Sequence, residues 1–91
     1  MPLDPVRLAD TRAWLLKAAN DLRGAEVDLA ADPPLPGDAL FHCQQVAEKA
    51  LKAFLTWHDR RFRKTHNLVE LGDQSREIDD TLHELCAGQR R

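Results

Sequence analysis

The residues best suited to chemistry gather in one short segment, 57–66. This segment holds four basic side chains, two of the four histidines and a single acidic residue. Arginine offers a planar fork of donors that matches phosphate oxygens, and a helix N-terminus beside it would add unpaired amides. We therefore predict a nucleotide- or phosphate-binding site that includes Arg60, Arg61, Arg63, Lys64 and His66. A second interpretation stays open, because basic residues at a helix C-terminus also complement the helix dipole in a solvated loop.

Arg61 and His66 have the spacing R-x4-H and are candidate catalytic residues. Cleavage of RNA without a metal needs a base for the 2′-hydroxyl proton and a cation for the charge on the phosphorane, and histidine and arginine suit these tasks. On a continuous helix, positions five apart point about 140° away from each other. Only a loop or a helix break could therefore bring the two side chains together.

Gln44 and Glu48 are the other polar residues in an unusual position. By angle they align with Leu51 and Leu55, on the flank of an apolar helical stripe. We expect them to hydrogen-bond across a packed seam with another helix or subunit. The alternative is that they line a groove with the basic segment and contribute to the binding site.

The composition describes one small domain over residues 1–91. The chain has 43% hydrophobic and 31% charged residues and a net charge of −2, which excludes a strongly basic nucleic-acid coat. No apolar run or leader pattern indicates a membrane span or export, so we predict a cytoplasmic protein that does not bind membranes. Cys43 and Cys86 lack CxxC spacing, and His83 with Cys86 lacks a second ligand pair, so we predict no metal site and no cofactor.

Proline and glycine restrict long regular structure to two main stretches. The first predicted helix covers about residues 5–31, with Gly24 inside it, and the proline-rich segment 32–37 turns the chain. Its apolar stripe consists of Trp14, Ala18, Leu22, Ala25 and Leu29. The second covers about residues 38–58, with Asp38 as N-cap. Its predicted core side carries Leu40, Cys43, Ala47, Ala50, Leu51 and Phe54, and its predicted solvent side carries His42, Gln45, Lys49 and Thr56.

A third helix is predicted to begin after Asn67. Asn67 followed by Glu70 fits a capping-box variant, and Leu71, Ile78, Leu82 and Leu85 keep helical spacing. Gly72 leaves open whether this region is one helix or two short ones. The sequence thus predicts an all-α fold, an antiparallel up-and-down helical bundle built on a long two-helix hairpin.

Three blocks of sequence resemble the HEPN domain family, whose name abbreviates higher eukaryotes and prokaryotes nucleotide-binding. They are WLLKAANDL at 14–22, FHCQQVAEKALKAFL at 41–55 and KTHNL at 64–68. The resemblance implies a helical bundle that forms homodimers and is often encoded beside a minimal nucleotidyltransferase as a toxin–antitoxin pair. Some members are metal-independent RNases whose arginine and histidine, in an R-x4-6-H motif, meet across the dimer cleft. Others are nucleotide-binding or accessory modules.

The chain departs from this family in two respects. The RNase motif of the family's toxins generally belongs to a later helix, whereas His66 here is part of the THNL signature. Family members of this type also commonly continue for another helix, so two alternatives stay open: the natural protein is short, or a C-terminal helix is missing from this sequence. A missing helix would leave the apolar stripes with less cover, which favours a dimer that completes the core.

Three hypotheses follow from the sequence. The preferred one is a noncatalytic HEPN partner or nucleotide-binding module, in which the basic segment with Gln44 and Glu48 engages a nucleotide, a phosphate or a partner nucleotidyltransferase. The second is a metal-independent endoribonuclease toxin in which His66 is the acid/base and Arg61 stabilises the transition state. The third is a structural helical adaptor.

Overall fold

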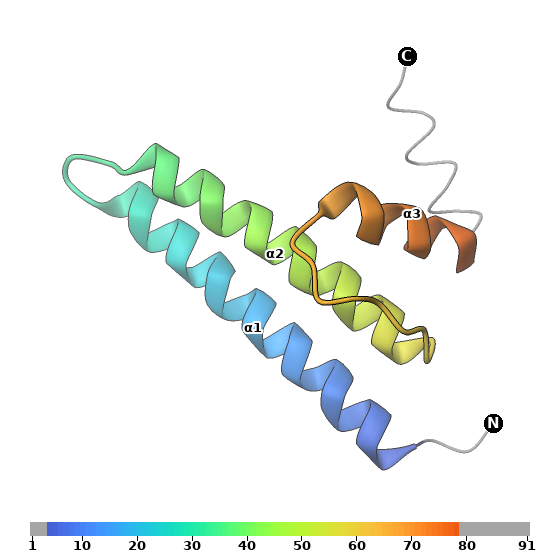
Figure 1. Cartoon of the computed structure of the whole chain (residues 1–91). Coiled ribbons are helices and arrows are strands. Elements are labelled where there is room, and N and C mark those ends of the chain that lie inside the picture. The colour runs from blue at the N-terminus through green and yellow to red at the C-terminus, as the bar shows by residue number, and fades with distance from the viewer. Residues whose placement is uncertain (1–3, 79–91) are drawn as a thin grey trace.

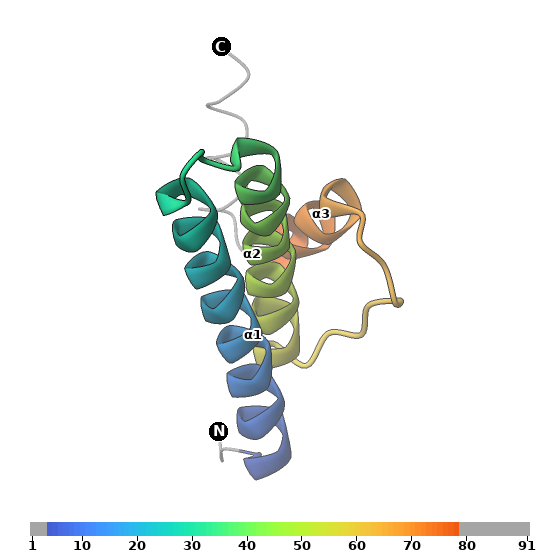
Figure 2. The same ribbon diagram turned by 90° about the vertical axis from the view of Figure 1, so that its left-hand side faces the viewer.

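The computed structural model describes residues 4–78, in which three helices follow one another without a strand. Helix α1 (Pro5–Ala30) and helix α2 (Pro36–Trp57) form an antiparallel hairpin (Figure 1). Helix α3 (Leu68–Ile78) packs against α2 on the side away from α1 (Figure 2). The predicted all-α, up-and-down arrangement on a two-helix hairpin is therefore confirmed. The predicted positions of Leu82, Leu85, His83 and Cys86 lie outside the described residues.

The first helix begins and ends close to the predicted bounds. Asp4 caps α1, because its Oδ1 accepts hydrogen bonds from the amides of Val6 at 2.9 Å and Arg7 at 3.4 Å. The helix continues through Gly24 and ends before the Asp32–Pro33 peptide bond, which is cis.

The predicted N-cap of the second helix was wrong. Helix α2 begins at Pro36, so Asp38 lies inside the first turn, and Leu35 at the cap position makes no side-chain cap bond. Proline fits the first helical position because its missing N–H would have no partner there. The amide of Leu35 donates instead to the carbonyl oxygen of Asp28 at 2.9 Å, which closes the hairpin turn.

The seam between α1 and α2 is more polar than predicted. Its buried apolar residues are alanines, among them Ala18 and Ala25 of α1 and Ala53 of α2. The predicted solvent residues His42 and Lys49 bind Asp21 of α1 instead. The buried Asp21 carboxylate needs hydrogen-bond partners, and small alanines let the two helices approach closely enough to supply them.

In the orientation that α2 adopts against α1, part of its predicted core stripe is exposed to solvent. Leu40, Cys43, Ala47 and Ala50 are exposed. The fully buried side chains of the described region are instead Leu55, Leu71 and Ser75, where α2 meets α3. No helix within residues 4–78 is both long and apolar enough to cross a bilayer.

Candidate functional site

The segment between α2 and α3 is a loop, as a convergent site would require. Helix α2 ends in a tight C-terminal turn, in which the Asp59 amide donates to the Thr56 carbonyl at 3.0 Å and the Arg60 amide to the Leu55 carbonyl at 2.8 Å. Asp59 adopts the left-handed conformation with φ of 55° that such a turn needs. The chain then runs as an extended loop to α3, so residues 60–67 are not on a helix.

Asn67 ends this loop as the N-cap of α3, as predicted. Its Oδ1 accepts hydrogen bonds from the amides of Val69 at 3.0 Å and Glu70 at 3.2 Å. The other half of the predicted capping box does not form, because the Asn67 amide donates to Thr65 Oγ1 and the Glu70 carboxylate pairs with Arg63. The amides of Val69 and Glu70 at the start of α3, which were expected to be free to bind an anion, are thus already hydrogen-bonded to Asn67. The helix itself runs through Gly72 as one element.

His66 is anchored by a buried carboxylate from the middle of α2. Its Nδ1 lies 2.6 Å from Glu48 Oε1, and Glu48 also accepts a hydrogen bond from Lys52 Nζ at 2.9 Å. The side chain of Glu48 is 3% exposed and that of Lys52 is 6% exposed, whereas that of His66 is 77% exposed. Glu48 therefore acts as a fixed internal acceptor for a histidine that lies on the surface.

Glu48 remains ionised despite its burial. Desolvation acts to raise the pKa of Glu48, but hydrogen bonds from Lys52 and His66 outweigh it and lower the pKa below the usual value for glutamate. An ionised carboxylate favours the proton on Nδ1 of His66. This leaves Nε2, on the exposed part of the ring, as the atom that can accept or donate a proton to a ligand.

An open hollow of about 390 Å³ lies beside this histidine. Its walls come from α2, from the end of the loop and from the first residue of α3. Gln45 Nε2 lies 3.4 Å from the second oxygen of Glu48, and Gln44 is exposed. The lining residues are Gln44, Gln45, Glu48, His66, Asn67 and Leu68. Two glutamine amides and an imidazole supply both donors and acceptors, which is the chemistry that recognises base edges and phosphate oxygens.

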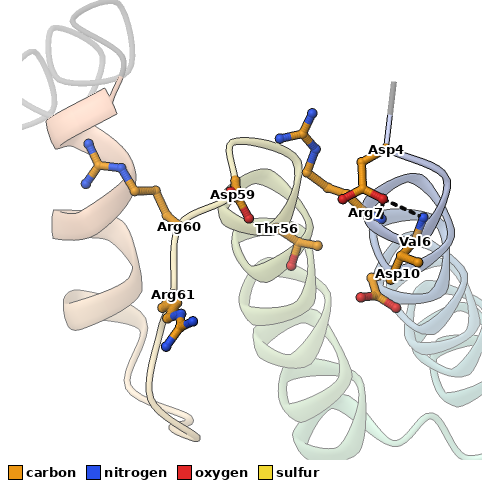
Figure 3. A pocket seen from close by; sticks show the side chains of 8 residues that line it. All are labelled: Asp4, Val6, Arg7, Asp10, Thr56, Asp59, Arg60 and Arg61. Atoms are coloured by element: carbon orange, nitrogen blue, oxygen red, sulfur yellow. Dashed lines mark hydrogen bonds between the residues drawn. The ribbon is translucent and has the colours of Figure 1, made fainter. Parts of the chain in front are cut away.

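The arginines of the loop point elsewhere. Arg63 Nε donates to Glu70 Oε1 at 2.8 Å, and Arg60 Nη1 lies 3.9 Å from Glu77 Oε2. Arg60 and Arg61 line a separate hollow of about 200 Å³ at the open end of the hairpin, with Asp4, Val6, Arg7, Asp10, Thr56 and Asp59. Figure 3 shows Arg60 extending toward α3 while Arg61 points away from it.

Of the predicted site residues, Gln44, Glu48 and His66 therefore lie together in one hollow, and Arg60 and Arg61 lie in another. A single protomer thus places Arg61 and His66 in different hollows. Lys64 lies exposed on the loop between them. Within residues 4–78, no three histidine, cysteine, aspartate or glutamate side chains are placed to share a metal ion.

The contact between Trp14 of α1 and the Lys52 ammonium group was not predicted from the sequence. Lys52 Nζ lies 5.1 Å from the ring centroid of Trp14 of α1, and this ring also packs edge-on against Phe62 of the loop at 6.1 Å. Trp14 therefore holds both the buried ammonium group and the middle of the loop. No local signal in the sequence pairs Trp14 with Lys52, because their contact depends on the tertiary structure.

The fold and the site together define a class of protein. It is a small helical hairpin with a third helix, in which a buried carboxylate of the hairpin orients a surface histidine just before that helix. A scan against family models matches the HEPN domain over residues 11–86. The chain belongs to the HEPN domain family, which supports a nucleotide-related or RNase-type module. No curated protein and no solved structure matches the chain.

Proposed function

We propose that this protein is a nucleotide- or phosphate-binding HEPN module and that its site is the hollow beside His66. The observation that carries the proposal is the contact between His66 Nδ1 and the buried Glu48 carboxylate at 2.6 Å. This contact fixes the ring before any ligand arrives and leaves Nε2 free of Glu48, in a hollow that Gln44 and Gln45 also line. A preorganised polar group loses little conformational entropy on binding, so it favours affinity.

The basic loop supports the proposal by its charge. Arg61 and Lys64 are exposed, and no salt bridge to either is found among residues 4–78. Their charges would attract a phosphate-bearing ligand toward the loop over distances up to about 8 Å at physiological ionic strength. Arg60 and Arg63 are paired with acids of α3, so we expect them to contribute less. Binding is favoured over cleavage because Arg61 and His66 line different hollows of the protomer.

The test is an NMR titration of the full chain with ATP and, separately, with inorganic phosphate. We expect ATP to shift the His66 imidazole signals and the side-chain amide signals of Gln44 and Gln45, and His66→Ala to weaken binding at least tenfold. His58→Ala is the matched control, because His58 is an exposed histidine at the opposite end of the loop. Absence of any shift in the hollow at millimolar ATP and phosphate, or equal affinity of the two variants, would contradict the proposal.

One observation favours a second candidate function, a metal-independent endoribonuclease. A histidine whose Nδ1 is held by an ionised carboxylate is the arrangement that a general base needs. In this proposal His66 takes the 2′-hydroxyl proton, and the 2′-oxygen attacks the adjacent phosphorus to give a phosphorane that Arg61 of another copy stabilises. The P–O5′ bond then breaks to leave a 2′,3′-cyclic phosphate, and the 5′-oxygen leaves with the proton that His66 returns. RNA incubated with the protein in a chelator tests it. If the residues come from two copies, an equimolar mixture of Arg61→Ala and His66→Ala recovers part of the cleavage that each variant lacks.

Family membership also supports a partner protein, and we propose a minimal nucleotidyltransferase acting in a toxin–antitoxin-like pair in the cytoplasm. The exposed cations Arg61 and Lys64 are the contacts that we assign to it. Co-elution of the two chains on size exclusion would test the pairing. The double variant Arg61→Glu, Lys64→Glu should abolish co-elution, whereas charge reversal of the distant, exposed Arg23 of α1 should preserve it.

A further inference from the structure

Lys52 and His66 contact the same oxygen of the Glu48 carboxylate. Lys52 Nζ donates to Glu48 Oε1 at 2.9 Å, and His66 Nδ1 lies 2.6 Å from the same atom. The two nitrogens are therefore within about 6 Å of each other, the range in which one charge changes the protonation of its neighbour. A buried ammonium group at this distance disfavours a second positive charge on the imidazole ring.

Trp14 of α1 holds the Lys52 ammonium group in this position. The ammonium nitrogen lies 5.1 Å from the ring centroid of Trp14 and donates to Glu48, and the Lys52 side chain is 6% exposed. Lys17 approaches the same ring at 4.7 Å, but its side chain is exposed. The negative face of an indole ring stabilises a cation, and most strongly a desolvated one. The charge of Lys52 therefore stays beside Glu48.

Glu48 and Lys52 together carry no net charge, and this balance decides the state of His66. A buried carboxylate alone would favour a protonated imidazole, because a contact with an opposite charge stabilises the cation. The charge of Lys52 compensates that carboxylate. On α3, the acid of the first turn, Glu70, is paired with Arg63 at 2.8 Å. A neutral imidazole whose Nδ1 carries the proton has a free electron pair on Nε2, which accepts hydrogen bonds.

The walls of the hollow indicate the same ligand chemistry. Within the part of the chain that the structure describes, the hollow is lined by three amide side chains, the imidazole, a carboxylate and Leu68, with no arginine or lysine. Phosphate binding uses cations or free backbone amides, whereas the amides of Val69 and Glu70 already donate to Asn67. The carboxylate also repels a phosphate. A nucleoside instead offers amino and hydroxyl donors to Nε2 and an apolar base to Leu68.

We propose that Lys52 is a positioning residue that keeps His66 uncharged, so that the hollow binds the nucleoside part of a nucleotide in preference to its phosphates. This inference rests on the proposed function and names the part of the ligand that the hollow takes. His66 Nε2 accepts a hydrogen bond from an amino or hydroxyl group of the nucleoside, and the phosphates lie outside the hollow. Lys52 and Trp14 do not line the hollow, so they act through Glu48 and His66.

NMR titration of the His66 imidazole in the full chain, without ligand, tests the role of Lys52. We expect the titration midpoint of His66 to rise by about one pH unit in Lys52→Met, because the uncompensated Glu48 charge then favours the imidazolium. Lys17→Met is the matched control. It removes an exposed ammonium group from the same Trp14 ring and should leave the midpoint unchanged. A folded Lys52→Met variant with an unchanged or lower midpoint would overturn the proposal.

A measurement on the wild type alone covers the case in which Lys52→Met fails to fold. The nitrogen chemical shifts of an imidazole report both its charge and which nitrogen carries the proton. We expect His66 of the wild type to be neutral at pH 7.5, with the proton on Nδ1. A ring that is still an imidazolium at this pH, or a neutral ring with the proton on Nε2, would overturn the proposal.

Separate titrations with adenosine and with inorganic phosphate test the ligand chemistry. At pH 7 we expect adenosine to shift the wild-type signals of His66, Gln44 and Gln45, and phosphate at the same concentration to leave them in place. Lys52→Met should bind adenosine about fivefold more weakly, because Nε2 then carries a proton and one accepted hydrogen bond is lost. Lys17→Met should bind it as the wild type does. Phosphate shifts as large as those of adenosine, or equal adenosine affinity of the two variants, would overturn the proposal.

A parallel titration with ATP separates this inference from the proposed function. If ATP shifts the signals of the hollow and adenosine does not, the proposed function stands and the preference for the nucleoside is overturned. If neither ATP, adenosine nor phosphate shifts these signals, the proposed function fails. The effect of Lys52 on the His66 titration is measured without ligand, so it is decided independently of that result.

Discussion

Glu48 and Lys52 form a buried ion pair, and we predict that removing both charges lowers the free energy of unfolding less than removing either one alone. The two side chains are 3% and 6% exposed and lie 2.9 Å apart. Glu48→Gln leaves the Lys52 ammonium group buried beside Trp14 without a counter-charge. Lys52→Met leaves the Glu48 carboxylate with one charge-assisted partner, the exposed His66.

The expected magnitudes follow from this burial. Breaking a buried pair costs about 3–5 kcal/mol, because the remaining charge stays desolvated, so we expect about 3 kcal/mol for each single variant. Replacing both partners by uncharged groups of similar size is often nearly neutral, so Glu48→Gln with Lys52→Met should cost about 1 kcal/mol or less. The whole domain has roughly 5–14 kcal/mol of stability at 0.05–0.15 kcal/mol per residue, so all three variants should be measurable.

The assay is urea unfolding followed by circular dichroism, at one fixed protein concentration so that any assembly contributes equally. Glu26→Gln is the control, since Glu26 is exposed on α1, and it should leave the midpoint unchanged. Two single variants that each cost less than about 1 kcal/mol, or a double variant whose cost is their sum, would refute the argument from burial.

The same pair predicts a pH dependence with a definite sign. Since the pKa of Glu48 is lowered below its usual value of 4.5, its contribution is complete above that pH and is lost as the pH falls through the lowered value. The Glu48→Gln variant should therefore lose less stability on acidification than the wild type. An equal or steeper loss in the variant would show that Glu48 is not held ionised by its partners.

Three further predictions concern the hairpin and the loop. A Cβ at Gly24 would lie 3.0 Å from His42 Cε1. Gly24→Ala should therefore stabilise by about 1 kcal/mol only in a His42→Ala background, which a double-mutant cycle in urea measures. Asn67→Ala should cost about 1 kcal/mol through loss of the cap, whereas Asn67→Asp should cost little in the same assay. The hydrogen bond from Lys49 lowers the pKa of Asp21 below 3.8, so Asp21→Asn should flatten the acid side of the stability profile below that pH.

The hairpin and the start of α3 could be predicted because their signals are local. Prolines at 33, 34 and 36 stop one helix and start the next, and Asn67 caps α3 through its own side chain. Each of these signals depends on residues within a few positions in the sequence. The error at Asp38 was also local, since Pro36 at the first helical position places the N-cap at Leu35, three residues before Asp38.

The orientation of α2 could not be predicted from its apolar stripe. The periodicity shows that Leu40, Ala47 and Ala50 share a side of the helix, and it does not say which surface that side meets. A second pattern does indicate which side of α2 meets α1. Asp21 and Asp28 are seven residues apart on α1, and His42 and Lys49 are seven residues apart on α2. In an antiparallel pair these four positions face each other, and the structure joins them.

The residues of the candidate site were predicted separately, and the structure brings only some of them together. Glu48 and His66 were separate candidates, and their contact at 2.6 Å depends on how the loop returns across α2. Arg61 and His66 had the spacing of a catalytic pair, yet an extended loop carries their side chains into different hollows. Spacing therefore identified the segment, whereas the pairing within it depended on tertiary contacts.

Helix α2 meets α1 with one face and α3 with another, and polar contacts on these two faces explain why polar residues of α2 are buried while apolar ones are exposed. Charged and polar contacts such as Lys49 with Asp21 set the register against α1, because an unpaired buried charge penalises any other register. Glu48 on the second face orients His66. Apolar side chains on the third face, such as Leu40 and Ala50, are exposed. Substitutions on the first face should therefore alter the packing of α1 against α2, whereas those at Glu48 on the second face should alter both the stability and the orientation of His66.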